Sequence, residues 1–165
     1  MFSKDIGIDL GTANVVIHVI GRGIVLDEPS VVAIKRSTGK VLAVGTEAYE
    51  MVGRTPGDIV AIRPLRDGVI ADFATTEEML RHFVEKIQVR GFFGGIRMLI
   101  CTPANVTPVE AKAIREAAEK AGAKEVFLAV EPKAAAVGSG MDIWKPVGHM
   151  IVDIGGGTTD VAILS

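Results

Sequence analysis

Two segments near opposite ends of the chain have the same order of residue types. Residues 8–17 read IDLGTANVVI, and residues 152–163 read VDIGGGTTDVAI. Each consists of an apolar strand with Asp near its end, a turn with glycine and threonine, and a second apolar strand. Turn glycines between β-branched runs predict a β-hairpin, and the distance between the two segments is far too long for a solenoid repeat. The sequence therefore predicts two related hairpins, which suggests two related half-molecules that face a common site.

The residue types at the two turns suit the phosphates of a nucleotide and a magnesium ion. Glycines have no Cβ, so backbone N–H groups can converge on an anion there. Asp9 and Asp153 stand at strand ends, where carboxylates can hold hydrated Mg²⁺ beside phosphates. Asp and Gly also dominate ordinary turns, which is the simpler explanation for one hairpin alone, but two matching hairpins favour phosphate binding. Neither GxGxxG leading into a helix nor GxxxxGK(S/T) is present, which argues against a Rossmann site and a P-loop.

The predicted elements indicate an α/β fold with a mixed sheet, because strands come first and helices and strands then alternate. A capping box at Thr75–Glu78 predicts the start of one helix, and Thr107–Glu110, with Pro108 at the first helical position, predicts the start of a second. Gly122 is the expected C-cap of the second helix. Strands are expected at 4–10, 14–20, 23–28, 29–35, 41–45, 97–101, 125–130, 149–154 and 159–165, and a further helix at 132–140.

Two apolar runs and one polar stretch allow more specific structural predictions. The continuous apolar runs 97–101 and 125–130 predict strands buried on both faces of the sheet. Residues 33–74 are polar and rich in turn formers, which predicts a small subdomain inserted into a larger one, with 54–72 mostly loop.

Length and composition limit the function classes. The chain has 165 residues, of which 48% are hydrophobic, so it can bury a sizeable core and is not intrinsically disordered. Its net charge of -2 gives no basic footprint, so no nucleic-acid partner is expected. The single cysteine, Cys101, cannot form an intrachain disulfide, which suits a reducing compartment, and we expect it to be a core residue rather than a nucleophile. No signal peptide or bilayer-spanning run is expected.

Three short motifs resemble the superfamily of actin, sugar kinases and heat-shock chaperone ATPases. IDLGT at 8–12 and DIGGGTTD at 153–160 resemble its two phosphate motifs, and EPKAAA at 131–136 resembles its first connecting motif. EPKAAA and the opening MFSKDIGIDLGTANV are nearest to the Mbl-type members of one family, the MreB family of bacterial actin homologues. Longer segments similar to that family are GIDLGTAN (7–14), GIVLDEPSVVA (23–33) and VGRTPGDIVAIRPLRDGVIADF (52–73).

The resemblance runs from Met1 to Ser165 and implies an actin-like ATPase fold, in which a ribonuclease H-like mixed sheet is flanked by helices. Residues 1–32 and 75–146 would form domain IA, residues 33–74 the inserted domain IB, and residues 147–165 the opening hairpin of domain IIA. The family clamps its nucleotide between two halves, and the chain matches only the first half. We therefore expect an N-terminal fragment that binds nucleotide weakly and does not hydrolyse it alone.

The resemblance also implies ATP and Mg²⁺ as cofactors and gives each site residue a role. Asp9 would help hold Mg²⁺ through water, and Asp153 would act near the metal and the attacking water. Glu131 matches the family's catalytic position, where a carboxylate orients and polarises that water; by position alone it is also an acidic residue favoured at a helix N-terminus. The residues expected near the β-phosphate are Gly11, Thr12, Ala13 and Asn14, and those expected near the γ-phosphate are Gly155, Gly156, Gly157 and Thr158.

The family's biology is implied in the same way. The chain would belong to a cytoskeletal ATPase whose copies form double filaments in the cytoplasm, at the inner face of the cell membrane. That protein would maintain rod shape by organising cell-wall synthesis, with shape-determining membrane proteins as partners. Phe92 and Phe93, which are flanked by glycines, would insert into the membrane, although Phe also commonly folds back into a core.

Three alternatives stay open at this point. The nucleotide-binding domain of a heat-shock chaperone ATPase shares both phosphate motifs, but the MreB-like segment 52–73 counts against it. A small-molecule kinase of the same superfamily needs an acceptor pocket and a general base, and the sequence identifies neither. The third alternative is a membrane-binding fragment without catalytic activity.

Overall fold

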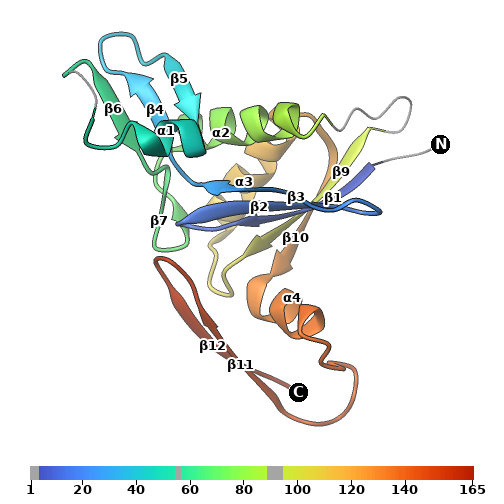
Figure 1. Ribbon diagram of the computed structural model, residues 1–165. Helices are drawn as coiled ribbons and strands as arrows, with labels where there is room; N and C mark the ends of the chain where they lie inside the picture. The colour runs from blue at the N-terminus through green and yellow to red at the C-terminus, as the bar shows by residue number, and fades with distance from the viewer. Residues whose placement is uncertain (1–3, 55–56, 89–94) are drawn as a thin grey trace.

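A five-stranded mixed sheet forms the centre of the computed structural model, which describes residues 4–54, 57–88 and 95–165 (Figure 1). Three of its strands pair antiparallel in the order β1-β2-β3, whereas β9 pairs parallel with both β1 and β10. The full order is β10-β9-β1-β2-β3, with β1 at Lys4–Leu10, β2 at Asn14–Val19, β3 at Gly23–Pro29, β9 at Ile96–Thr102 and β10 at Ala123–Val130. The mixed sheet predicted from the sequence is confirmed.

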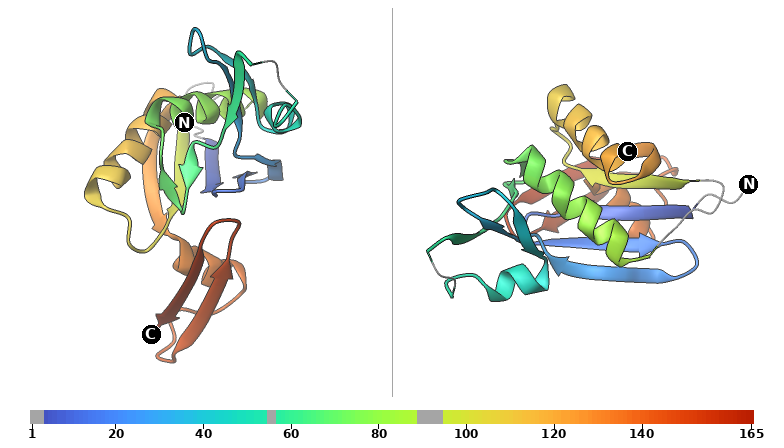
Figure 2. Two further views of the ribbon diagram at one scale, coloured as in Figure 1. Left: turned by 90° about the vertical axis from the view of Figure 1, so that its left-hand side faces the viewer. Right: turned by 90° about the horizontal axis from the view of Figure 1, so that it is seen from above.

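Helices α2 (Phe73–Lys86) and α3 (Pro108–Lys120) cover one face of this sheet (Figure 2). Side chains alternate between the two faces along a strand, so every second residue of β1, β2 and β9 points toward the helices, and these residues are apolar. The buried residues are Ile6, Ile8, Val15, Ile17, Val19, Ile96, Met98 and Ile100 from the strands, and Met79, Leu80, Phe83, Val84, Ile114, Ala117 and Ala118 from the helices. These side chains form one contiguous core.

The ends of α3 follow the sequence prediction closely. The N–H of Glu110 donates to Oγ1 of Thr107 at 3.3 Å, and the N–H of Thr107 donates to Oε2 of Glu110 at 2.8 Å, which is the predicted capping box. The C-cap is Ala121, and Gly122, which was expected to be the C-cap, is the next residue. Its φ of 108° lies in the region that favours glycine.

The start of α2 differs from the sequence prediction. The predicted capping box at Thr75 and Glu78 is wrong, because the helix already begins at Phe73. The carboxylate of Asp72 caps it and accepts a hydrogen bond from the N–H of Thr75 at 2.9 Å. Thr75 is itself buried in the first turn of the helix.

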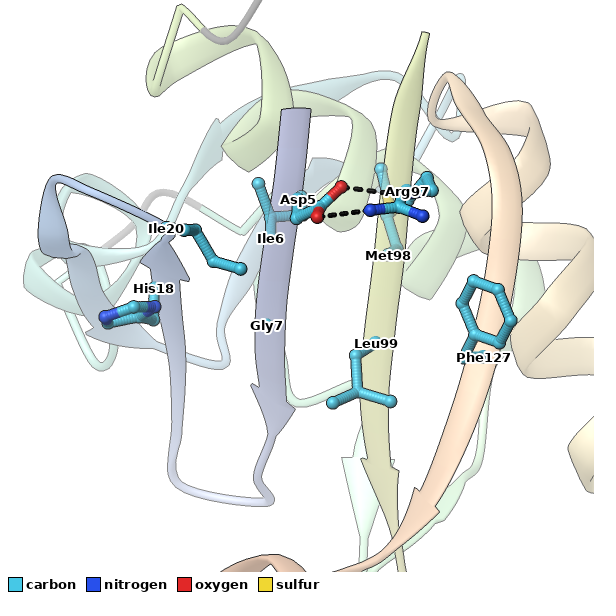
Figure 3. Close-up of a pocket in the computed structure, with 9 residues that line it drawn as sticks. All are labelled: Asp5, Ile6, Gly7, His18, Ile20, Arg97, Met98, Leu99 and Phe127. Atoms are coloured by element: carbon cyan, nitrogen blue, oxygen red, sulfur yellow. Dashed lines mark hydrogen bonds and ion pairs between the residues drawn. The ribbon is translucent and has the colours of Figure 1, made fainter. Parts of the chain in front are cut away.

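The second face of the central sheet is only partly buried, so the prediction that 97–101 and 125–130 are buried on both faces is wrong. Burial alternates along β9, and Leu99 and Phe127 are 45% and 50% exposed. Parallel strands are buried on both faces where helices cover both, and α2 and α3 both lie on the other face. A hollow of about 450 Å³ lies over the exposed face (Figure 3), lined by Asp5, Ile6, Gly7, His18, Ile20, Arg97, Met98, Leu99 and Phe127.

Three short strands, all within the described residues 32–54 and 57–62, form a smaller sheet at one end of the molecule (Figure 1). The short helix α1 packs against it, and a two-stranded ribbon of β7 and β8 follows it. The small sheet has the order β5-β4-β6, and the elements are β4 Val32–Lys35, β5 Val41–Val44, α1 Thr46–Glu50, β6 Ile59–Ile62, β7 Leu65–Arg66 and β8 Val69–Ile70. The stretch 54–72, predicted to be mostly loop, thus contains three short strands. The proposed domain boundaries at 33 and 74 stay predictions.

The last part of the chain lies apart from the central sheet (Figure 1, orange to red). Helix α4 (Glu131–Gly138) leads to a hairpin of β11 (His149–Ile154) and β12 (Thr159–Leu164). Within the described residues this hairpin forms a two-stranded sheet of its own. The predicted helix and the two predicted strands are confirmed within two residues at each end, and the proposed domain boundary before residue 147 stays a prediction.

The cap of α2 can be tested by substituting Asp72. We expect Asp72→Ala to lower the free energy of unfolding by about 1 kcal/mol, because the N–H of Thr75 loses its acceptor. Asp72→Asn is the matched control, since Asn caps helices as well as Asp does. Urea unfolding followed by circular dichroism measures both variants, and an equal loss in the two would contradict the capping role.

Candidate functional site

The two hairpins that resemble each other in sequence also match in register. Each has an Asp in its next-to-last paired position and four residues in its turn, with the pairs Asp9–Val16, Leu10–Val15, Asp153–Asp160 and Ile154–Thr159. The turns are therefore residues 11–14 and 155–158, which hold all eight of the predicted phosphate contacts. The prediction of two related hairpins is confirmed.

The two turns lie directly against each other. A Cβ added to Gly156 would lie 2.3 Å from the Cβ of Ala13, and one added to Gly157 would lie 2.7 Å from Cγ2 of Thr12. Both distances are far shorter than a normal van der Waals contact. The close approach of the first turn therefore requires glycine at these two positions of the second turn, a reason that the sequence did not reveal.

Parallel pairing brings further residues to the same edge of the central sheet. β1, β9 and β10 run in the same direction, with Ile8 opposite Ile100 and Thr102 opposite Val130. Their carboxyl ends therefore lie together, where β1 leads into the first turn and β10 leads directly into Glu131 of α4. Ligands of open α/β sheets bind outside the carboxyl ends of the strands.

A small cavity lies between the first turn and these strand ends. Its volume is about 30 Å³, and its lining includes Gly11, Thr12, Cys101, Glu131 and Thr158. This volume has room for a water molecule. Thr12 and Thr158 come from the two opposing turns, so this cavity brings residues of both turns together with Glu131.

Acidic side chains crowd this edge of the sheet. Burial raises the pKa of Asp9, and the neighbouring charge of Asp153 raises it further. Burial also raises the pKa of Glu131, and the charges of Asp9, Asp153 and Asp160 add to that effect. The negative charges therefore repel one another, and a cation placed among them would relieve the repulsion.

Two of these carboxylates fit a hydrated magnesium ion. Among the described residues, no three His, Cys, Asp or Glu side chains are placed to hold a metal ion together. Mg²⁺ commonly takes one or two carboxylates and fills its remaining positions with water and phosphate oxygens. Asp9 and Asp153 supply carboxylates of that kind, so the residues present suit an ion that is bound together with a phosphate.

Cys101 lies at the same cavity but does not have the properties of a nucleophile. Burial raises the pKa of its thiol to about 11, and the charges of Asp9 and Glu131 contribute to the shift. The thiol is therefore protonated at neutral pH, which agrees with the prediction from sequence. Its side chain is half-buried, so it lies at the margin of the core rather than inside it.

Two side chains that the sequence did not single out hold the backbone of the first turn. The hydroxyl of Ser30 donates to the carbonyl oxygen of Gly11 at 2.6 Å. Nη1 of Arg63 donates to the carbonyl oxygen of Ala13 at 3.3 Å and to that of Thr12 at 3.5 Å. Both residues lie in segments that carry the family resemblance, which is the signal that could have found them.

Two further hydrogen bonds fix side chains of the first turn. The N–H of Gly68 donates to Oγ1 of Thr12 at 3.0 Å. Nδ2 of Asn14 donates to Oδ1 of Asp27 at 2.8 Å, so the amide of Asn14 is bound to β3. This bond uses one of the two hydrogens of Nδ2 and holds the amide of Asn14 beside β3.

The predicted membrane contact cannot be placed in the same way, because Phe92 and Phe93 lie outside the described residues. Within residues 4–54, 57–88 and 95–165, no helix combines the length and the apolar character needed to cross a membrane.

A model of the MreB/Mbl protein family matches residues 3–165. The chain belongs to the MreB/Mbl family. Cell shape-determining protein Mbl of Bacillus cereus is 70% identical over 165 residues, which make up 100% of this chain and 50% of that protein. Cell shape-determining protein MreB of Escherichia coli is 56% identical over 170 residues, covering 100% of this chain and 49% of that protein. The expected similarity to Mbl-type members is confirmed, and the chain spans about half the length of the curated relatives it matches.

Solved structures of related proteins confirm the predicted actin-like fold. MreB5 of Spiroplasma citri bound to ADP superimposes with a TM-score of 0.89 at 43% identity, over 99% of this chain and 49% of that one. The MamK double helical filament gives a TM-score of 0.81 at 26% identity, over 97% of this chain and 49% of that one. The family assignment decides against the chaperone and kinase alternatives.

The contact between the two turns predicts the effect of one added methyl group. Gly156→Ala brings a Cβ onto that of Ala13, so we expect the free energy of unfolding to fall by about 1–3 kcal/mol. Adding Ala13→Gly removes the colliding atom, so the double variant should recover most of that loss relative to Ala13→Gly alone. Gly148→Ala is the control, because a Cβ there meets nothing within 4 Å. Urea unfolding measures each variant, and equal losses at the two glycines would exclude the turn contact as the cause.

The burial of Asp9 and its repulsion by Asp153 predict a stability effect that depends on pH. Because the pKa of Asp9 is raised in the folded chain, its ionised form destabilises the fold at neutral pH, and protonation removes this cost as the pH falls through the raised pKa. Asp9→Asn should raise the melting temperature at pH 7 by about 1–3 °C, since solvent screens part of the repulsion. The gain should disappear in acid, where Asp9 is protonated.

Calorimetry of Asp9→Asn across this pH range is the measurement, with Glu119→Gln on the exposed surface of α3 as the control. A melting temperature at pH 7 that stays equal to that of the unsubstituted chain, or falls below it, would show that Asp9 carries no unfavourable charge.

Proposed function

We propose that the chain forms the ATP-binding first half of an actin-like cytoskeletal protein that assembles into filaments and determines cell shape. The observation that carries the proposal is the pair of matched, opposed turns with Glu131 beside them at the carboxyl edge of the sheet. It is supported by relatives named cell shape-determining proteins Mbl and MreB, and by a structural relative bound to ADP. The proposed division into domains IA, IB and IIA belongs to the same proposal.

In this proposal the two turns hold the phosphates through their backbone N–H groups. Residues 11–14 approach the β-phosphate, and residues 155–158 line the γ-phosphate. Consecutive N–H groups in a tight turn form a concave site for an anion, which supports this assignment. Asp9 and Asp153 hold Mg²⁺ through water. Bound Mg²⁺ supplies neutralisation of the charge on the phosphate oxygens.

Glu131 is the proposed catalytic residue. Its carboxylate would orient and polarise the water that attacks the γ-phosphate, and the cavity beside it has room for that water. Its raised pKa supports the role, because a carboxylate with a raised pKa is a stronger base when ionised. Phosphoryl transfer needs chiefly such positioning together with charge stabilisation.

We also propose that the protein works in the cytoplasm at the inner face of the cell membrane. Phe92 and Phe93 would insert into the lipid, and many weak insertions along one filament would add up. The double helical filament of the structural relative MamK supports self-assembly into paired filaments. Proteins of cell-wall synthesis and shape-determining membrane proteins are the proposed partners.

The function is tested with the full-length protein that the gene encodes. We expect it to sediment and to form filaments in electron micrographs with ATP, and to stay in solution without nucleotide. Glu131→Gln should retain ATP binding and release phosphate at least about 100-fold more slowly, because the water loses its general base. Glu50→Gln on the exposed surface of α1 is the control. A lack of filaments with ATP would refute the cytoskeletal function, and normal phosphate release by Glu131→Gln would refute its catalytic role.

A further inference from the structure

We propose that Arg63 is a positioning residue that aims the backbone N–H groups of the first turn at the phosphate; this inference rests on the proposed nucleotide function. Arg63 directly follows β6 of the small sheet, and its guanidinium reaches the first turn from there. It donates to the carbonyl oxygens of Thr12 and Ala13. The small sheet thus extends a donor to the part of the chain that is proposed to bind nucleotide.

All three carbonyl groups at the start of this turn are held by donors from other segments. The hydroxyl of Ser30 donates a hydrogen bond to the carbonyl oxygen of Gly11 at 2.6 Å. The backbone N–H of Ser30 donates to the carbonyl oxygen of Ala13 at 2.8 Å. Arg63 holds the carbonyl of Thr12 and shares that of Ala13. Within this set, the carbonyl of Thr12 depends on Arg63 alone among the described residues.

Holding a carbonyl also fixes the N–H of the following residue. The peptide group is planar and trans, so its C=O and the next N–H point in opposite directions. Fixing the carbonyls of Gly11, Thr12 and Ala13 therefore directs the N–H groups of Thr12, Ala13 and Asn14 to the other side of the turn. Among the described residues, none accepts a hydrogen bond from the N–H groups of Thr12 and Ala13, so both can donate to an anion.

The hydroxyl of Thr12 is also fixed in position and can also donate to an anion. Oγ1 of Thr12 accepts a hydrogen bond from the N–H of Gly68, and a hydroxyl that accepts one bond still has its own hydrogen to donate. Gly68 lies in the turn between β7 and β8, five residues after Arg63. Segment 63–68 thus holds the first turn at the backbone of Thr12 and at its side chain.

Arginine suits this role better than lysine does. Its planar guanidinium presents several N–H donors in a fixed geometry and stays protonated at any pH the protein meets. One of its nitrogens serves both carbonyls, and the side chain as a whole is exposed.

The test compares ADP with AMP, because only ADP carries the β-phosphate that the first turn is proposed to bind. In the full-length protein, competition against a fluorescent ADP analogue gives the affinity for each nucleotide. Arg63→Ala should lower the ratio of ADP affinity to AMP affinity about 10-fold, since the N–H groups of Thr12 and Ala13 are no longer aimed. Arg36→Ala, an exposed arginine of the small sheet, should leave the ratio unchanged.

A second measurement separates positioning from a simple loss of positive charge. Hydrogen exchange of the N–H groups of Ser30 and Gly68, which donate to Ala13 and Thr12, should be faster without nucleotide in Arg63→Ala, because the first turn loses a support that is present before any phosphate arrives. Arg63→Gln, which keeps part of the side-chain stem, replaces Arg63→Ala if the latter does not fold, and the same two changes are expected.

Each remaining outcome has a definite meaning. An unchanged ratio in Arg63→Ala, an equal loss of ADP and AMP affinity, or unchanged exchange of the N–H groups of Ser30 and Gly68 would overturn the positioning role while leaving the proposed function standing. A full-length protein with its natural sequence that binds neither ADP nor ATP would overturn the proposed function, and the positioning role with it.

Discussion

The parallel pairing of β1 with β9 and of β9 with β10 is the constraint on which the candidate site depends. It makes three strands end at one edge of the sheet, so that the first turn and Glu131 meet although they are far apart in the chain. A shift of one residue in either pair would turn Ile8 or Ile100 out of the core, and both are buried. Burial of apolar side chains therefore fixes the register of these strands. The register in turn fixes where each strand ends, and with it the spacing of the residues proposed to act on ATP.

The two opposed turns pack closely against each other, and they are also proposed to bind the phosphates. Close packing and phosphate binding compete for the same space. Gly156 and Gly157 let the turns approach until no further atom fits between them, whereas the phosphates would have to enter near the same place. Admitting a nucleotide therefore requires the turns to separate. The carboxylates at this edge repel one another, so an accompanying cation would favour the arrangement with nucleotide over one without it.

Features that depend on neighbouring residues could be predicted from the sequence, and features that depend on distant ones could not. The capping box of α3 spans Thr107 to Glu110 and is correct, whereas the one predicted at Thr75 is wrong because Asp72, three residues earlier, caps α2. The exposed second face of β9 likewise depends on where α2 and α3 pack. The hairpins were found because they resemble each other; Ser30 and Arg63 were not, because their bonds to the first turn span 19 and 50 residues or more.

These long-range bonds make the small sheet part of the proposed nucleotide site. If phosphate binding orders the first turn, the carbonyl groups of Thr12 and Ala13 also become more ordered and restrain the side chain of Arg63. Arg63 directly follows β6, so this restraint also acts on the small sheet. Coupling between two binding events is reciprocal, so whatever holds the small sheet in place must strengthen nucleotide binding by the same free energy. In the proposed filament, a neighbouring copy that touched β4, β5 or β6 would have this effect. Assembly and nucleotide binding would then favour each other through segment 63–68, without any contact between the neighbouring copy and the nucleotide.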